Sequence, residues 1–302
     1  MVDVGRMLSK FMRHAERVCV PTAAAGRAIE VPRIDVHGTP LPVIGFGTSG
    51  LRGQRCAAMV ETALALGYRY IDTAQAYGNE ADVGRGIARS PVSRDEIFLA
   101  TKLEQAKLGA DTVRREVDES LRRLGTDYVD LLMVHWPSKE IPLRETLTAF
   151  AQLRDEGRVR HIGVCNFTVA LLHEAVEENG ADLLCNQVEY HPLLAQETLL
   201  PYQQSRGIAL VAYCPLARGR VLRDRTLRRL GAKHGKSPAQ IALAWLTAHE
   251  LVSAIPKASS EAHCRANLEI FDIQLSAEER AEIDALDRGE RVIDPSWAPD
   301  WD

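Results

Sequence analysis

Eight apolar segments alternate with helical patterns from residue 43 onward, and this alternation restricts the fold more than any other feature of the sequence. The segments are almost continuously apolar, which is typical of parallel strands buried on both faces. They are VIGFGT (43–48), YRYID (68–72), EIFLAT (96–101), YVDLLMVH (128–135), VRHIGVC (159–165), DLLCNQVEY (182–190), IALVAYC (208–214) and LVSAIP (251–256).

Helical periodicity separates these segments, so the chain predicts eight strand–helix units. The helical patterns cover residues 56–66, 79–88, 111–124, 144–157, 169–179, 196–207, 237–249 and 260–271. Eight such units favour a closed α/β (β/α)8 TIM barrel over an open sheet. No GxGxxG follows the first strand, so a Rossmann fold has no local support. The segment RIDVHGTPLPVIG (33–45) predicts a β-hairpin before the barrel, turned at His37-Gly38.

Composition and charge narrow the class of protein and its partners. Of 302 residues, 46% are hydrophobic and 26% charged, which is ordinary for a globular protein with a large core. A net charge of −4 argues against nucleic-acid or anionic-membrane partners, and no apolar run approaches the ~18 residues that span a bilayer. Six scattered cysteines indicate reduced thiols and a cytoplasmic location, and the histidines form no metal-binding pair.

The first 32 residues differ from the rest and are interpreted as an N-terminal extension. Apolar residues fall on one face of a predicted helix, at Val4, Leu8, Phe11, Ala15 and Val18. The sequence PTAAAG that follows is interpreted as a linker. Either an additional helix or an upstream start codon explains this segment better than an organelle-targeting signal. The barrel domain is expected over 33–302.

Polar residues stand at the end of almost every predicted strand. In a (β/α)8 barrel these ends meet at one mouth, where the chemistry takes place. Each residue alone has an ordinary structural explanation, such as helix capping or a solvated side chain, but their joint placement predicts one site. The residues are Asp72, with Tyr77 on the following loop, and Lys102, His135, Asn166, Gln187, Tyr213 and Lys257.

Four of these residues could protonate an oxygen as it becomes an alkoxide. A phenol has a pKa near 10, and an ammonium beside it favours the phenolate. Lys102 could therefore tune Tyr77, Asp72 could fix Lys102, and His135 could orient a carbonyl oxygen. This is half of a carbonyl reduction, and the hydride would need a cofactor because side chains cannot supply one.

These residues lie in motifs that closely resemble the aldo-keto reductase family over residues 33–302. The motifs are GYRYIDTAQAYGNE, the TK of FLATK, DLLMVHWP, IGVCNF, NQVEYHP, AYCPLARG and IPKASS…N. The resemblance implies that Tyr77, Asp72, Lys102 and His135 form the family's catalytic tetrad. Tyr77 is then the proton donor, and His135 orients the carbonyl.

The resemblance also implies a nicotinamide cofactor. Asn166, Gln187 and Cys165 would hold the carboxamide, and Tyr213 would stack on the ring. The implied cofactor residues are Thr48, Asp72, Cys165, Asn166, Gln187, Tyr213, Cys214, Leu216, Arg218, Lys257, His263 and Asn267. Lys257 would pair with a 2′-phosphate, which favours NADPH. His263 replaces an expected arginine, which weakens that preference and leaves NADH possible.

The expected substrate is a small carbonyl compound. Its site would include His135, Trp136, Ser49 and Glu104, where Ser49 and Glu104 replace aromatic walls that are frequent in the family. The short loop after His135 resembles bacterial members that reduce 2,5-diketo-D-gluconate or methylglyoxal, so small aldehydes, ketones or sugar-derived dicarbonyls are expected, on a monomer. Two alternatives stay open: a non-enzymatic nicotinamide-binding sensor or structural protein, and a Schiff-base aldolase with Lys102 as nucleophile.

Overall fold

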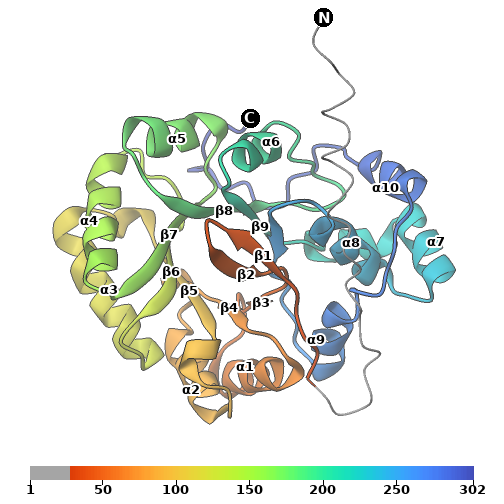
Figure 1. Ribbon diagram of the computed structural model, residues 1–302, viewed down its shortest axis with the longest axis horizontal. Helices are drawn as coiled ribbons and strands as arrows, with labels where there is room; N and C mark the ends of the chain where they lie inside the picture. The colour runs from red at the N-terminus through yellow and green to blue at the C-terminus, as the bar shows by residue number, and fades with distance from the viewer. Residues whose placement is uncertain (1–27) are drawn as a thin grey trace, which may run out of the picture.

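Residues 28–302 of this computed structural model form a barrel of eight parallel strands in the order β10-β9-β8-β7-β6-β5-β4-β3 (Figure 1). A parallel bridge between Ile44 and Ala254 joins the first strand region to the last, so the sheet closes on itself. The predicted (β/α)8 fold is confirmed. The strands are β3 Phe46–Gly47, β4 Tyr70–Asp72, β5 Phe98–Leu103, β6 Val129–Val134, β7 Val159–Cys165, β8 Leu183–Glu189, β9 Ala209–Tyr213 and β10 Val252–Ala254.

The predicted hairpin is also confirmed, and it closes the N-terminal end of the barrel. Strands β1 (Arg33–Val36) and β2 (Thr39–Pro42) are antiparallel. His37 and Gly38 connect them with φ of 53° and 83°, the left-handed pair that a tight hairpin turn requires. Val36 and Leu41 pack in the barrel lumen. Figure 1 shows the hairpin in the centre of the ring of strands.

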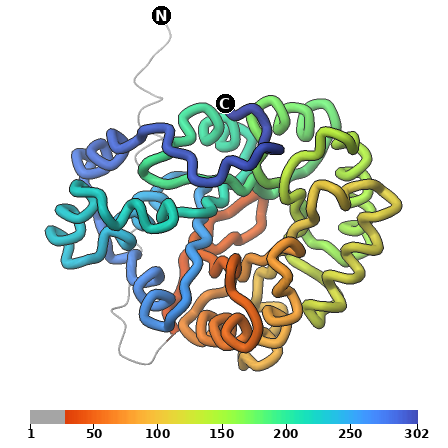
Figure 2. The backbone as a smooth tube through the Cα atoms, turned by 180° about the vertical axis from the view of Figure 1, so that it is seen from behind, coloured from red at the N-terminus to blue at the C-terminus, as the bar shows by residue number. Residues whose placement is uncertain are grey.

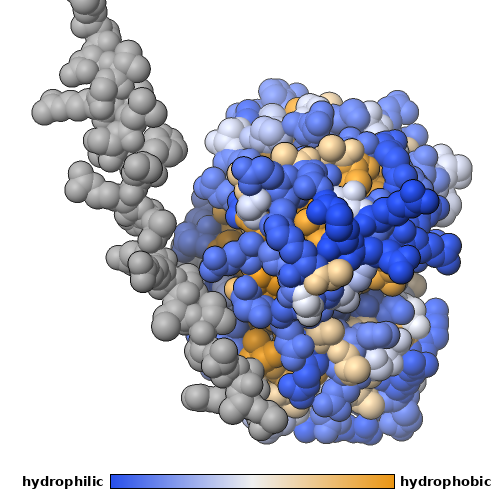
Figure 3. Space-filling model, turned by 90° about the vertical axis from the view of Figure 1, so that its right-hand side faces the viewer, coloured by the Kyte–Doolittle hydropathy of each residue, from blue (hydrophilic) through white to orange (hydrophobic). Residues whose placement is uncertain are grey.

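Helices surround the barrel and follow the strands in the predicted alternation. They are α1 Gly53–Leu66, α2 Glu80–Arg89, α3 Ala110–Leu124, α4 Leu143–Asp155, α5 Val169–His173, α6 Leu199–Ser205, α7 Arg225–His234, α8 Pro238–Thr247, α9 Glu261–Leu268 and α10 Ala277–Asp284. After α5 the helix widens into the π-helical turn η5 (Glu174–Glu178). In Figure 3, the side that carries α7 and α10 is mostly hydrophilic, as expected for the outer faces of amphipathic helices.

Two apolar layers stabilise the barrel. The lumen is filled by side chains from alternate strand positions, among them Tyr70, Leu131, Met133 and Val211. A larger layer lies between the sheet and the helices. Because both faces of the strands are buried, their sequences are continuously apolar, which is the pattern that predicted them.

The structure contains two helices, α7 and α10, that the eight predicted helical patterns omit. Both have local start signals: Asp224 accepts hydrogen bonds from the first turn of α7, and Ser276 forms a capping box with Glu279 in α10. Each helix buries only two or three residues. In α7 a few apolar residues stand among many charged ones, and in α10 the amphipathic pattern is weak, so neither stretch stands out as an apolar helical segment.

The C-terminal segment crosses the molecule on the side away from the hairpin, as Figure 2 shows. Its contacts reach the end of β8 and the start of α5, where Asp302 accepts from the amide of Val169. No helix described within residues 28–302 is long and apolar enough to cross a membrane. The predicted N-terminal helical face lies outside the described residues.

Candidate functional site

A buried ion pair stands at the mouth of the barrel. Lys102 Nζ lies 2.5 Å from Asp72 Oδ1 and also donates to the carbonyl of Thr73 at 2.8 Å. Their side chains are 0% and 2% exposed. Strands β4 and β5 are neighbours in register, so the two strand ends bring the acid and the amine together. Asp72 raises the pKa of Lys102 despite its burial, so this lysine is a firmly protonated ammonium.

Tyr77 lies beside this pair on the short 3-10 turn η2 (Gln75–Tyr77), immediately after β4. The ammonium of Lys102 is 5.3 Å from the centroid of its ring. Burial raises the pKa of the phenol to about 12, although Lys102 acts in the opposite direction. Tyr77 is therefore protonated at neutral pH, and Lys102 would stabilise the phenolate that forms when the proton leaves.

His135 faces Tyr77 across the site. The two rings meet edge to face with centroids 5.7 Å apart. Burial and the charge of Lys102 lower the pKa of His135 to about 3. The imidazole is thus neutral at neutral pH, so it can donate a hydrogen bond to a carbonyl oxygen but is a poor source of a proton.

Three further predicted residues form a hydrogen-bonded wall next to the tetrad. Gln187 Nε2 donates to Asp72 Oδ2 at 2.8 Å. Asn166 donates to the carbonyl of His135 at 3.0 Å and accepts from the hydroxyl of Tyr213 at 2.8 Å. Asn166 has a φ of 64°, a left-handed conformation that asparagine tolerates better than most residues. These bonds link the end of β7 to β9 and to the residue after β6, and the end of β8 to that of β4.

A cavity of about 630 Å³ opens above these side chains. Most of the predicted site residues line it. They are Ser49, Asp72, Tyr77, His135, Trp136, Cys165, Asn166, Gln187, Tyr213, Cys214, Leu216, Arg218 and Lys257. The cavity thus brings together the residues that the sequence placed at different strand ends.

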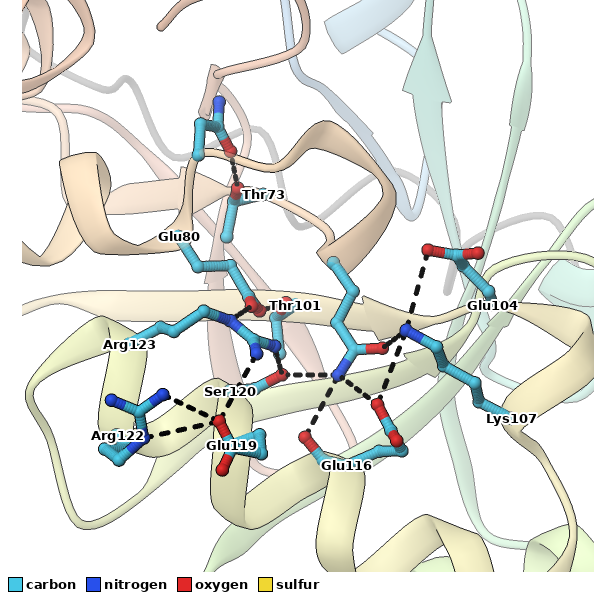
Figure 4. Close-up of polar contacts among 12 residues, drawn as sticks. Thr73, Glu80, Thr101, Glu104, Lys107, Glu116, Glu119, Ser120, Arg122 and Arg123 are labelled. Carbon is cyan, nitrogen blue, oxygen red and sulfur yellow. Dashed lines mark hydrogen bonds and ion pairs between the residues drawn. The ribbon is translucent and has the colours of Figure 1, made fainter. Parts of the chain in front are cut away.

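Five predicted residues are outside the lining. Thr48 is buried and donates to the backbone carbonyl of Asp72 at 2.9 Å, and Lys102 lies behind Asp72. Glu104 is outside the lining, and its carboxylate lies 3.9 Å from Lys107 Nζ (Figure 4). The remaining two, His263 and Asn267, lie on α9.

The far end of the cavity suits an anionic group. Both Arg218 and Lys257 line it, are exposed, and form no ion pair with another residue of 28–302. The loop after β9 holds three non-glycine residues at positive φ: 48° at Cys214, 46° at Ala217 and 50° at Arg218. Strained backbone conformations of this kind are common at ligand-binding sites. The positive charges of Arg218 and Lys257 beside this loop could bind a phosphate group.

The sequence predictions missed part of the cavity wall. Gly47, Gly219, Ile255 and Pro256 lie next to predicted residues, whereas Ile293 comes from the C-terminal segment. The backbone amides of Val292 and Ile293 each donate to the carboxylate of Glu189 at 2.7 Å. Glu189 is fully buried and also bonds to His191 at 2.9 Å. Glu189 and His191 stand together in the sequence EYH, but no local pattern indicates that Glu189 binds backbone amides about 100 residues later.

Comparisons with known proteins agree with this geometry. The model of the aldo/keto reductase family matches residues 43–288. This chain belongs to that family. Methylglyoxal reductase DkgB of Escherichia coli O157:H7 is 40% identical over 87% of this chain and 99% of its own length. The resemblance seen in the sequence is therefore confirmed, and the protein is an oxidoreductase.

Two solved structures support the same conclusion. One, assigned as a 2,5-diketo-D-gluconic acid reductase B, is 40% identical with a TM-score of 0.88 and covers 90% of this chain and 98% of that one. A Bombyx mori aldo-keto reductase in complex with NADP is 34% identical with a TM-score of 0.83 and covers 89% of this chain and 97% of its own. Within residues 28–302, no group of acidic, His or Cys side chains could hold a metal ion.

Proposed function

We propose that this protein is an NADPH-dependent reductase of small dicarbonyl compounds, of the methylglyoxal or 2,5-diketo-D-gluconate type. One observation carries the proposal: a protonated phenol, Tyr77, lies beside the buried Lys102–Asp72 pair at the base of a cavity that ends in unpaired cations. The nicotinamide group supplies the hydride when bound. Tyr77 provides the proton, and the Lys102–Asp72 pair stabilises the phenolate that remains.

In this proposal His135 and Tyr77 divide the work on the carbonyl oxygen. His135, neutral because its pKa is about 3, donates a hydrogen bond that orients the oxygen. Tyr77, with a pKa of about 12, then gives its proton to the oxygen as it becomes an alkoxide. An alkoxide is far more basic than a phenolate, so the transfer is favourable, and Lys102 stabilises the phenolate left behind.

The proposed cofactor contacts follow the cavity from its base to its rim. Asn166, Gln187 and Cys165 would face the carboxamide, and Tyr213 would cover the ring. The side-chain amide of Gln187 already donates to Asp72, so its carbonyl oxygen is the atom left for a ligand amide. Arg218 would meet the pyrophosphate and Lys257 the 2′-phosphate, which favours NADPH over NADH.

The Schiff-base alternative is disfavoured by the state of Lys102. A nucleophilic amine must lose its proton, and catalytic lysines have a lowered pKa. Asp72 raises the pKa of Lys102 instead, and the ammonium is already bonded to that carboxylate and to Thr73. The lysine is therefore suited to hold a charge beside the phenol.

The test is NADPH consumption with methylglyoxal by the wild-type protein and by Tyr77→Phe. The variant keeps the ring but lacks the proton, so kcat is expected to fall by about 10³-fold or more while NADPH binding, followed by its fluorescence, is kept. Turnover by Tyr77→Phe at the wild-type rate would reject the proposed acid. Normal NADPH binding by the wild type without turnover on any of a wide panel of carbonyls would favour the non-enzymatic alternative.

A further inference from the structure

The turn that carries Tyr77 is attached to α3 by the side chain of Gln75. Gln75 is the first residue of η2 and Tyr77 is the last. The side chain of Gln75 is buried, with 8% of the residue exposed, and it points away from the cavity toward α3. Its amide bonds to Glu116, Ser120 and Lys107, three residues that Figure 4 labels in this region.

Both ends of the amide are hydrogen-bonded. Its nitrogen donates to the backbone carbonyl of Glu116 and to the hydroxyl of Ser120, each at 3.0 Å, and lies 3.4 Å from the Glu116 carboxylate. Its oxygen accepts from Lys107 Nζ at 3.3 Å. Lys107 is in turn 3.4 Å from Glu116 and 3.9 Å from Glu104. The amide therefore links η2 to a rigid helix and to the loop after β5.

Other side chains anchor the loop outside the turn, and two of them come after Tyr77. Asn79 donates to the carbonyls of Thr48 and Leu51 at 3.0 Å. Glu80, which is buried, accepts from Thr101 at 2.6 Å and from Arg123 at 2.7 Å. Both residues follow Tyr77. Before the turn, Thr73 donates its hydroxyl to Asn79 at 2.8 Å, and its carbonyl accepts from Lys102 at 2.8 Å. Within η2 itself, Gln75 supplies the side-chain hydrogen bonds to another element of the described chain.

We propose that Gln75 is a positioning residue: its amide fixes η2 to α3 and thereby sets the place of the Tyr77 hydroxyl relative to Lys102 and the carbonyl oxygen. This inference rests on the proposed role of Tyr77 as proton donor. A shift of about 1 Å in a reacting group can lower the rate by ~10²-fold, so a link this close to the phenol matters for kcat. Cofactor binding does not depend on it, because none of the Gln75 contacts lines the cavity.

The test begins with Gln75→Met, which keeps the length of the side chain and removes both polar ends. We expect kcat with methylglyoxal to fall about tenfold or more, with the dissociation constant of NADPH unchanged in fluorescence titrations. The matched control is Arg122→Gln, which removes an exposed bond to Glu119 on the same helix and should leave kcat unchanged. A folded Gln75→Met protein with wild-type kcat would overturn the inference.

A charge exchange separates positioning from general stability. Gln75→Glu places a second carboxylate beside Glu116 and should lower kcat. Gln75→Glu with Glu116→Gln removes this like-charge pair and should recover part of the loss, while the backbone carbonyl of residue 116 still lacks the donor it has in the wild type. Equal kcat in the single and double variants would contradict the proposal. If Gln75→Met does not fold, Ser120→Ala replaces it in the test, because this change removes only one partner of the Gln75 amide. An unchanged kcat in Ser120→Ala would then contradict the positioning role of Gln75.

The outcomes also separate this inference from the proposed function. If Tyr77→Phe abolishes turnover and Gln75→Met does not lower it, only the positioning role fails. If Tyr77→Phe keeps wild-type turnover, the proposed acid itself fails, whatever Gln75→Met does.

Discussion

The two ends of the cavity are built differently. At the base, Asp72 and Lys102 are almost completely buried and are bonded to each other, to Gln187 and to the backbone. At the rim, Lys257 and Arg218 are exposed and form no ion pair with other residues of 28–302. The base is thus organised before any ligand arrives, whereas the rim depends on the ligand to order its side chains. Substitutions should therefore have large effects on catalysis at the base and moderate effects on affinity at the rim.

The largest effect is expected for Lys102→Met. The change removes the cation that stabilises the phenolate, so kcat should fall by about 10³-fold. It also leaves Asp72 charged and buried without its partner, which should cost about 3–5 kcal/mol of unfolding free energy. Steady-state assays and thermal denaturation measure the two effects. The control is Lys139→Met, at an exposed lysine outside the cavity lining, and a Lys102→Met kcat within tenfold of wild type would show that the base is not organised as described.

The pH dependence tests the same end of the cavity. Because the pKa of Tyr77 is raised to about 12 and that of His135 is lowered to about 3, both keep their protonation between pH 6 and 9. The kcat for carbonyl reduction should therefore be flat over this range. Alcohol oxidation needs the phenolate, so its rate should rise about tenfold per pH unit below that pKa. Single-turnover measurements in both directions provide the check, and a bell-shaped reductive profile centred near pH 7 would contradict the assignment.

The difference between the two ends also explains what could be predicted from the sequence. Asp72, Lys102 and His135 were predictable because a (β/α)8 barrel places all strand ends at one mouth, whatever the loops do. Glu104 shows the limit of that reasoning. It follows Lys102 by two residues, but β5 ends at Leu103, and Glu104 is the N-cap residue of the turn η4 (Gln105–Lys107). Its side chain lies near Lys107 and outside the cavity lining.

Long-range contacts were beyond local patterns for a similar reason. The bonds from Val292 and Ile293 to Glu189 join segments more than 100 residues apart, and each residue is unremarkable in its own stretch. The eight helical patterns omit α7 and α10 because these stretches contain many charged residues and few apolar ones, although their caps are recognisable in the sequence. In this chain, the arrangement of apolar residues along the sequence predicts the buried strands and helices. The features that it does not predict are held by polar contacts.

At the rim, Lys257→Met should raise the KM for NADPH about fivefold and leave kcat unchanged. An ion pair between an exposed lysine and a phosphate contributes on the order of 1 kcal/mol. The KM for NADH should not change, since NADH lacks the 2′-phosphate, and added salt should reduce the difference between variant and wild type. Lys139→Met again provides the control. A fall in kcat, or an equal effect on both cofactors, would mean that Lys257 does not meet the 2′-phosphate.

The smallest effect is expected for His263→Arg. His263 lies in the first turn of α9, where its backbone amide donates to the N-cap Ser260 and the helix dipole already favours an anion. A guanidinium adds a fixed charge and a planar donor pair, but it remains exposed and must give up side-chain freedom, so the gain is about threefold. The ratio of kcat/KM for NADPH to that for NADH should rise by this factor, and His263→Gln, which adds no charge, should not raise it. If the arginine leaves the ratio unchanged, α9 does not reach the 2′-phosphate, and of these two residues Lys257 alone sets the cofactor preference.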